Sequence, residues 1–344
     1  MTAAHPGLDR PSASDDRRSA AEDGSLPAPS LPDGALIIAG APIAAEIRER
    51  VRRGVVAYRR RQRRAPVLAV LHLSRGPSFE MYARQIARAG ERVGIEVRRV
   101  GIGVPSPAGT SLPRPNPGTP PVPGRRISGM ALRARLRELS SDPEIDAIIV
   151  QQPLPRGIPP VAVFEGLDPA RDVDGITPLN AGMLAAGQPA FAPATAQAVA
   201  EILDRSAGAL EGLHAVVVGR SLAVGRPVAQ LLLRRNCTVT VCHSRTRDLA
   251  SYTRQADVLV VAAGRPGLLG AGMIRPGAIV VDVGTTVVDG RVVGDVDPEP
   301  ARAVAAAVTP VPGGVGPVTN AILLEHVLQA ARARARARER SRSR

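Results

Sequence analysis

Short hydrophobic runs alternate with amphipathic stretches along most of the chain, and this pattern predicts an α/β fold. In the first half we predict strands at residues 36–38, 67–71, 95–100 and 145–150, separated by helices at residues 43–63, 79–93 and 131–139. In the second half we predict a helix at residues 195–204 and strands at residues 215–218, 238–242, 258–262 and 278–283. The apolar continuity of these later strands favours a parallel sheet covered by helices on both faces.

Changes in this pattern divide the chain into five parts. The N-terminal segment is rich in Pro, Ser, Asp and Ala and has too few apolar residues to form a core. We therefore expect a disordered extension (residues 1–34) followed by an α/β domain (35–185) that contains a Pro-rich insertion (105–126). A Rossmann-type domain (186–317) comes next, then a helix that packs on the first domain (318–334) and an Arg-rich tail (335–344).

The composition is that of a globular protein, with 44% hydrophobic residues. No apolar run reaches the roughly 20 residues that a membrane span needs, and the N-terminal residues lack the apolar segment of a secretion signal. We therefore expect a cytoplasmic protein with no membrane partner. Cys237 and Cys242 are too few and too close for a disulfide framework, so we interpret both as buried and reduced.

The basic residues of the chain limit both its possible partners and its possible chemistry. The formal net charge is +14, and the segment Arg332–Arg344 contributes seven arginines against one glutamate. Such a tail can bind nucleic acid, but no aromatic stacking platform accompanies it, so we favour a solvated or partly helical tail over a nucleic-acid partner. The chain contains no lysine, and arginine cannot act as a general base because its guanidinium stays protonated.

A glycine-rich turn is the first candidate site. The apolar run Ala215–Val218 is followed by Gly219, Arg220 and Ser221, and then by the start of a helix at Gly225. Glycine allows the backbone to approach phosphate closely, and a helix N-terminus offers free N–H groups. The spelling differs from G-x-G-x-x-G, so a purely structural strand-to-helix turn is the alternative.

The end of the next strand discriminates between cofactors. NAD-preferring domains place an acidic residue about 20 positions beyond the first glycine. Here His243, Ser244 and Arg245 occupy that place, and a hydroxyl and a guanidinium suit a 2′-phosphate. We therefore expect NADP as the cofactor, and we interpret His243 as an exposed turn residue.

Four further segments carry a resemblance to a known family. They are Val-Gln-Gln-Pro-Leu-Pro at residues 150–155, Asp-Val-Asp-Gly at 172–175, Val-Asp-Val-Gly at 281–284, and Thr-Pro-Val-Pro-Gly-Gly-Val-Gly-Pro-Val-Thr at 309–319. In this order, over residues 36–330, the chain resembles the bifunctional methylenetetrahydrofolate dehydrogenase/methenyltetrahydrofolate cyclohydrolase family. The resemblance implies an N-terminal folate domain and a C-terminal NADP domain facing each other across a cleft. It also implies tetrahydrofolate derivatives as substrates, and a homodimer.

The resemblance also implies roles for individual residues. Tyr82 would stack near the folate, Gln151 would line the reacting centre and Asp174 would hydrogen-bond the pterin. The cofactor phosphates would be held by Gly219, Arg220 and Ser221, and Thr285 would lie beside the nicotinamide. From residue type alone, Tyr82 could equally be a core aromatic, Gln151 a strand-end residue and Asp174 a turn former.

The chain departs from the family pattern in the first domain. The family has Tyr-x-x-x-Lys on one helix, whereas Tyr82 is followed by Ile86. Arg84 and Arg88 point away from that face of the helix, and Phe79 and Ala194 replace a usual serine and cysteine. We therefore predict an NADP-dependent dehydrogenase whose cyclohydrolase activity is in doubt, the alternative being a non-catalytic NADP- or folate-binding regulator or partner protein.

Overall fold

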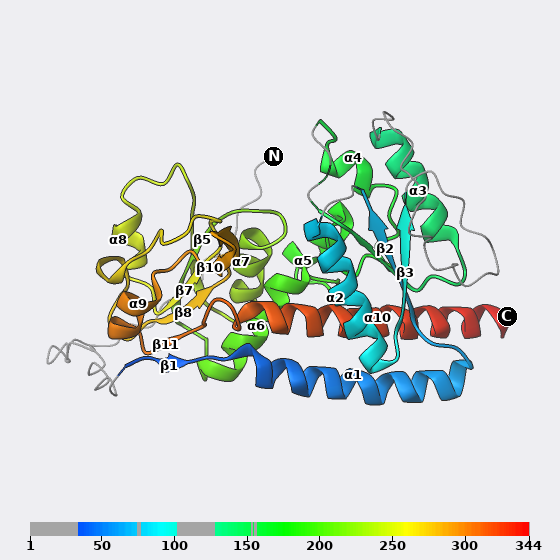
Figure 1. Cartoon of the computed structure of the whole chain (residues 1–344), viewed down its shortest axis with the longest axis horizontal. Coiled ribbons are helices and arrows are strands. Elements are labelled where there is room, and N and C mark those ends of the chain that lie inside the picture. Colours follow the sequence, from blue (N-terminus) through cyan, green and yellow to red (C-terminus); the bar gives the residue numbers. More distant parts are fainter. Residues whose placement is uncertain (1–33, 74–76, 102–127, 153, 155–156, 344) are drawn as a thin grey trace, which may run out of the picture. The chain divides into compact units, whose positions relative to one another are not determined.

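The computed structural model describes residues 34–343 except residues 74–76, 102–127, 153 and 155–156. The Pro-rich insertion and all but the last residue of the predicted N-terminal extension lie outside this range. Within it, two parallel sheets and a set of helices confirm the predicted α/β class (Figure 1).

The larger sheet has six strands in the order β1-β11-β8-β7-β5-β6, all paired in parallel. Its strands are β1 (Leu36–Ile37), β5 (His214–Val218), β6 (Thr238–Cys242), β7 (Val258–Val261), β8 (Ile279–Asp282) and β11 (Ala307–Val308). Alternate residues of β5 belong to different cores: Val217 packs in one hydrophobic cluster and Val216 in another. Both faces of the sheet are therefore covered at its central strands, which is why β5 and β7 are apolar and buried along almost their whole length.

The smaller sheet has three parallel strands in the order β3-β2-β4, namely β2 (Val67–His72), β3 (Glu96–Gly101) and β4 (Ala147–Val150). Every residue of β4 is buried, and β2 is buried as far as Leu71. Helix α2 (Pro77–Val93) packs on β3, and α3 (Gly129–Ser141) contributes Leu132 and Leu136 to the core on the other face.

Two long helices, α1 (Gly40–Gln62) and α10 (Val315–Arg342), lie side by side (Figure 1). The first buries a stripe that includes Ile43, Ile47, Val51 and Val55, the spacing of one helical face. The second also packs on α6 (Ala194–Ser206), α2, β2 and β4. Residues of both sheets share one hydrophobic cluster with these helices.

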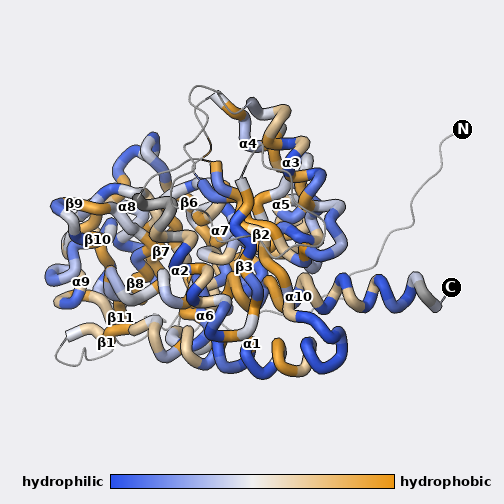
Figure 2. The backbone as a smooth tube through the Cα atoms, turned by 45° about the vertical axis from the view of Figure 1, so that its right-hand side comes forward, coloured by the Kyte–Doolittle hydropathy of each residue, from blue (hydrophilic) through white to orange (hydrophobic). Residues whose placement is uncertain are grey.

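The C-terminal helix differs from the prediction, because it does not end near residue 334 but continues to Arg342. Its last part alternates between hydrophobic and hydrophilic residues (Figure 2). Alanine and arginine both favour helix, and several contacts hold the segment against the rest of the protein. Arg334 pairs with the buried Asp146 at 3.7 Å, Arg338 donates to the Pro143 carbonyl, and Glu339 pairs with Arg61 at 2.7 Å. Most of the predicted tail is therefore part of a packed helix.

The first strand also differs from the predicted division. Leu36 and Ile37 pair with Ala307 and Val308, so β1 completes the edge of the larger sheet although the prediction placed it in the first domain, residues 35–185. The remaining elements are short: α4 (Pro160–Phe164), α5 (Pro178–Ala185), α7 (Gly225–Leu233), α8 (Leu249–Thr253), α9 (Pro298–Val304), a 3-10 turn (Ala271–Met273), and the hairpin of β9 (Thr286–Val288) and β10 (Arg291–Val293).

No helix among the described residues is long and apolar enough to cross a membrane. In the same part of the chain, no group of His, Cys, Asp and Glu side chains is arranged to hold a metal ion.

Candidate active site

The Gly219 turn joins the end of β5 to the start of α7. Gly219 has φ +129°, and its N–H donates to the Cys242 carbonyl at 2.8 Å. A Cβ added at Gly219 would overlap the Ala262 carbonyl, and one added at Gly225 would overlap the carbonyl of Gly219. The turn therefore needs glycine at both positions, because strand, turn and helix start are packed backbone against backbone.

The turn also carries two polar side chains, those of Arg220 and Ser221. The Ser221 hydroxyl accepts from the Val224 and Gly225 N–H groups at 3.2 and 3.4 Å, which fixes the loop that leads into α7. Arg220 is exposed, as is Ser221. The arrangement offers a guanidinium and a hydroxyl beside a helix N-terminus, which is a suitable environment for phosphate.

The end of β6 lies next to this turn, because Cys242 pairs in register with Val218. The loop after β6 is held by its own contacts: the Thr246 hydroxyl accepts from the His243 N–H at 2.8 Å, and the Arg245 N–H donates to the His243 ring at 3.1 Å. Ser244 and Arg245 are exposed. The structure therefore brings together Gly219, Arg220 and Ser221 with Ser244 and Arg245 at one edge of the larger sheet.

Two buried carboxylates organise the loops at the ends of β7 and β8. Asp282 accepts from the N–H groups of Gly284, Asp295 and Val296 at 2.8 to 3.0 Å. Asp295 in turn accepts from the N–H groups of Ala263, Gly264 and Arg265 at 2.6 to 2.8 Å. Burial raises the pKa of Asp282, while its three backbone donors oppose that rise. Thr285 directly follows this network and is exposed.

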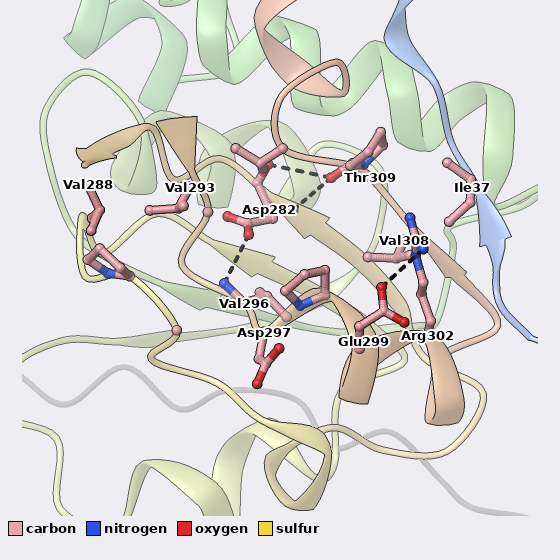
Figure 3. Close-up of a pocket in the computed structure, with 16 residues that line it drawn as sticks. Ile37, Asp282, Val288, Val293, Val296, Asp297, Glu299, Arg302, Val308 and Thr309 are labelled. Carbon is pink, nitrogen blue, oxygen red and sulfur yellow. Dashed lines mark hydrogen bonds and ion pairs between the residues drawn. The ribbon is translucent and has the colours of Figure 1, made fainter. Parts of the chain in front are cut away.

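A pocket of about 530 Å³ lies beside the Asp282 network (Figure 3). Its walls come from β1, β8, β11, the β9–β10 hairpin and the start of α9, and include Asp282, Thr309, Val293 and Arg302. None of the nine site residues predicted from the sequence lines it. The pocket is formed at the opposite half of the sheet from β5 and β6, so it does not mark the predicted nucleotide site.

In the smaller sheet, Gln151 follows the end of β4 and is only 3% exposed. Its Oε1 lies 3.0 Å from Nδ1 of His72, the last residue of β2. Arg99 of β3 donates from Nε to Nε2 of the same imidazole at 3.2 Å. Gln151 is therefore held in a polar row that spans all three strands. His72 and Arg99 were not predicted as site residues.

The Asp-Val-Asp-Gly segment lies against β4 through a bridge between Asp172 and Ile148. Asp172 is fully buried and accepts from the Ile176 and Thr177 N–H groups and from the Asn180 amide at 2.7 to 3.1 Å. A Cβ at Gly175, where φ is +62°, would overlap the backbone of residues 191–193. The first aspartate, Asp172, therefore shapes this loop.

Asp174 keeps some solvent exposure but is crowded by protein atoms. Burial, and then the charge of Asp172, raise the pKa of Asp174 to about 7, although the Ala194 N–H donates to this carboxyl group and opposes the rise. This contact comes from the backbone, so it does not depend on the cysteine that the family usually has at position 194. A carboxyl group that titrates near neutrality can either accept or donate a hydrogen bond at physiological pH.

His326 of α10 fixes the same loop from the other side. Its Nδ1 lies 2.9 Å from the Val173 carbonyl, and its ring packs against Phe191 at 5.3 Å. A carbonyl only accepts, so Nδ1 carries the proton, and burial lowers the pKa of His326 and keeps the ring neutral. Sequence reasoning missed this residue, because its only signal was a polar residue on the buried stripe of the last helix.

Helix α2 carries both Tyr82 and Ile86. The structure places Tyr82 on this helix, whereas its side chain lies outside what the structure describes. Ile86 is 2% exposed and belongs to the hydrophobic cluster of β2 and β4. The position of the family's lysine is therefore filled by an apolar side chain in a dry core.

The fold and the Gly219 turn define the class of protein: an α/β protein with a dinucleotide-binding sheet. Residues 193–335 match the model of the tetrahydrofolate dehydrogenase/cyclohydrolase NAD(P)-binding domain. This match covers less than half of the chain, and the relatives below, which match most of it, show that the chain belongs to the tetrahydrofolate dehydrogenase/cyclohydrolase family.

Relatives cover most of the chain. It is 47% identical over 265 residues to the bifunctional protein FolD of Nocardia farcinica, covering 77% of this chain and 86% of that protein. It is 46% identical over 300 residues to bifunctional protein FolD 1 of Rubrobacter xylanophilus, covering 87% and 98%.

Solved structures agree with these relatives. The bifunctional FolD dehydrogenase/cyclohydrolase of Campylobacter jejuni superposes with a TM-score of 0.77 at 35% identity, covering 87% of this chain and 99% of that one. The Trypanosoma brucei enzyme, solved with NADP and an inhibitor, gives a TM-score of 0.76 at 33% identity, covering 88% and 99%. The resemblance stated from the sequence is confirmed, while the domain limits and the nine site residues stay predictions.

Proposed function

We propose that this protein oxidises 5,10-methylenetetrahydrofolate to 5,10-methenyltetrahydrofolate with NADP. The observation that carries the proposal is the edge of the larger sheet, where the Gly219 turn comes together with the exposed Ser244 and Arg245, and where residues 243–247 after β6 include no Asp or Glu. A carboxylate there would repel a 2′-phosphate, whereas a guanidinium binds it.

The residues present fit NADP. The backbone-packed turn leaves no room for a Cβ at Gly219 or Gly225, as a close phosphate cradle requires. Gly219, Arg220 and Ser221 would hold the diphosphate, Ser244 and Arg245 the 2′-phosphate, and Thr285 would lie at the nicotinamide end. When bound, NADP supplies the hydride acceptor, which is the part of the chemistry that amino-acid side chains cannot provide.

The protein's own task is then orientation. Asp174 would hydrogen-bond the pterin, Tyr82 would pack near it, and Gln151 would line the reacting centre. Asp172 and His326 keep the Asp174 loop in one conformation. Hydride transfer needs the donor carbon and the acceptor ring in a fixed near-attack geometry, and orientation alone accelerates such steps by several powers of ten.

Hydrolysis of the methenyl bridge to 10-formyltetrahydrofolate is the second activity that the family implies. Hydrolysis needs an activated water and a moved proton, a task suited to a lysine with a lowered pKa. Because Ile86 is buried where that lysine belongs, we propose that this activity is much weaker than the dehydrogenase activity.

Purified protein, methylenetetrahydrofolate and NADP provide the test, with absorbance of the methenyl product and of NADPH as the readout. We expect NADPH and methenyl product to form together, with slow appearance of the formyl product. NADP binding without any turnover between pH 6 and 9 would instead support a non-catalytic binding protein.

The predicted assembly and location belong to the same proposal. We propose that the smaller sheet region (residues 35–185) binds the folate and the larger (residues 186–317) binds NADP, and that the protein acts as a cytoplasmic homodimer. Sedimentation at micromolar concentration tests the dimer, and a monomer there would contradict it.

A further inference from the structure

The polar row of the smaller sheet lies on a single face. Arg99, His72 and Gln151 each stand two residues beyond Val97, Val70 and Ile149, respectively, and side chains in a strand alternate with a period of two. Val70 and Ile149 belong to the hydrophobic cluster that also contains Ile86, and Val97 packs against it. The three polar side chains therefore occupy the face of the sheet that helix α2 covers.

The direction of the hydrogen bonds in this row follows from chemistry. A guanidinium can only donate, so Nε2 of His72, 3.2 Å from Nε of Arg99, must be an acceptor. The proton of the neutral ring is then on Nδ1, which lies 3.0 Å from Gln151. Nδ1–H can only donate, so the amide oxygen of Gln151 faces His72 and the amide nitrogen faces away.

This row bears on the proposed function, on which the inference rests. The family pattern has a lysine at position 86 of α2, but this position is a buried isoleucine here and the chain contains no lysine. The sheet provides a donor to the glutamine from another direction. A donor on one side of the amide fixes which end of the amide group faces it, because the oxygen accepts and the nitrogen donates.

We propose that Arg99 and His72 are positioning residues for Gln151. Arg99 selects the tautomer of His72, and His72 fixes the amide of Gln151 so that its N–H groups are the part presented to the folate. The pair orients the glutamine through the sheet, although it does not supply a base for hydrolysis.

Matched substitutions at His72 separate hydrogen bonding from bulk. His72→Leu removes the donor, whereas the amide nitrogen of His72→Asn can lie near the position of Nδ1 and still donate. We expect His72→Leu to lower kcat for methylenetetrahydrofolate oxidation about 10- to 100-fold, as loss of an orienting contact does elsewhere, with the KM for NADP unchanged. His72→Asn should stay within about 3-fold of wild type.

His214→Leu is the control, because His214 is also a strand histidine but bonds to Thr240 and the Gln255 carbonyl in the larger sheet. Its kcat should match that of the wild type. Equal loss in His72→Leu and His72→Asn, or no loss in His72→Leu, would overturn the inference.

A second measurement does not depend on turnover. The chain has five histidines, so a two-bond ¹⁵N–¹H spectrum of histidine-labelled wild-type protein, assigned with His72→Asn, reports each tautomer. We expect His72 to be neutral with the proton on Nδ1, and Arg99→Met to release that preference. An Nε2–H or doubly protonated His72 in the wild type would overturn the inference. If the wild type shows no turnover, the proposed function fails, while this spectrum still decides the tautomer.

Discussion

The nucleotide edge of the larger sheet and the strand ends of the smaller sheet are built from different parts of the chain. At the nucleotide edge, backbone atoms form most of the site, because Gly219 and Gly225 are packed too closely for any Cβ. At the second, buried side chains such as Gln151 and Asp172 carry the geometry. A chain without lysine loses nothing at a site made of backbone N–H groups, but must replace partners at a site made of side chains. The family pattern holds at the site built of backbone, whereas the lysine position of the family has changed to Ile86 in the region built of side chains.

The largest expected effect tests the backbone site. Gly219→Ala places a methyl group against the Ala262 carbonyl at a backbone angle that alanine rarely adopts, so the turn must move. We expect NADP to bind at least about 100-fold more weakly, because displacement of about 1 Å costs that much in a positioned site. Fluorescence titration with NADPH measures it. Gly182→Ala, where a Cβ meets open space, is the control, and equal binding by both variants would contradict a backbone-built site.

The buried carboxylates come next. Asp172→Asn turns an amide N–H₂ toward N–H donors, and we expect the free energy of unfolding to fall by about 2–4 kcal/mol. Asp282→Asn should cost as much, because it too accepts three hydrogen bonds. Urea unfolding gives both values, with the exposed Asp297→Asn as the control at about 0.5 kcal/mol or less. A cost at Asp172 no larger than at Asp297 would show that this loop does not depend on its carboxylate.

A smaller effect is expected on the preference for NADP over NAD. Arg245→Ala removes the guanidinium expected at the 2′-phosphate, and we expect kcat/KM with NADP to fall about 10- to 100-fold, the value of a charged hydrogen bond. We expect kcat/KM with NAD to stay nearly the same. Arg247→Ala, two residues further along the same exposed loop, is the matched control. If Arg245→Ala affects NAD and NADP alike, the residue contributes to the fold of the loop and not to the 2′-phosphate.

The last prediction is a pH dependence of stability. Folding raises the pKa of Asp174 from its ordinary value of 3.8 to about 7, so between these values the folded state binds a proton that the unfolded state has lost. Stability contributed at this residue therefore decreases as pH rises from 4 to 7 and is constant above 7. Asp174→Asn should flatten that part of the curve of unfolding free energy against pH. Identical slopes for variant and wild type would place the carboxyl pKa near its ordinary value.

Much of the fold could be predicted from the sequence, because long apolar runs and amphipathic helices dominate it. The pairing of β1 with β11 could not, since two-residue strands far apart in the chain leave no periodic signal. The β9–β10 hairpin was missed although Asp289 and Gly290, both with positive φ, form the Asp-Gly turn typical of such hairpins. The helix through Arg342 was missed because an alternation of alanine and arginine looks solvated until its ion pairs are known.

The candidate site was predictable where a motif was local. The Gly219 turn and the loop after β6 meet because parallel strands end at the same edge, a relation that strand order implies. The His72 and Arg99 contacts join three strands whose register the sequence does not determine. His326 reaches the Asp174 loop from a helix near the other end of the chain. Such contacts depend on tertiary packing and have no pattern of their own.

Contacts between the two ends of the chain also have a consequence for folding during synthesis. The strand that is synthesised first, β1, can pair only after β11 has been synthesised. The smaller sheet can be covered by α10 only after this last helix has been synthesised. Neither half can reach its final packing while the ribosome is still translating the chain, so a fragment of either half expressed alone should expose apolar surface and aggregate. We therefore expect the two sheet regions to unfold in one cooperative transition.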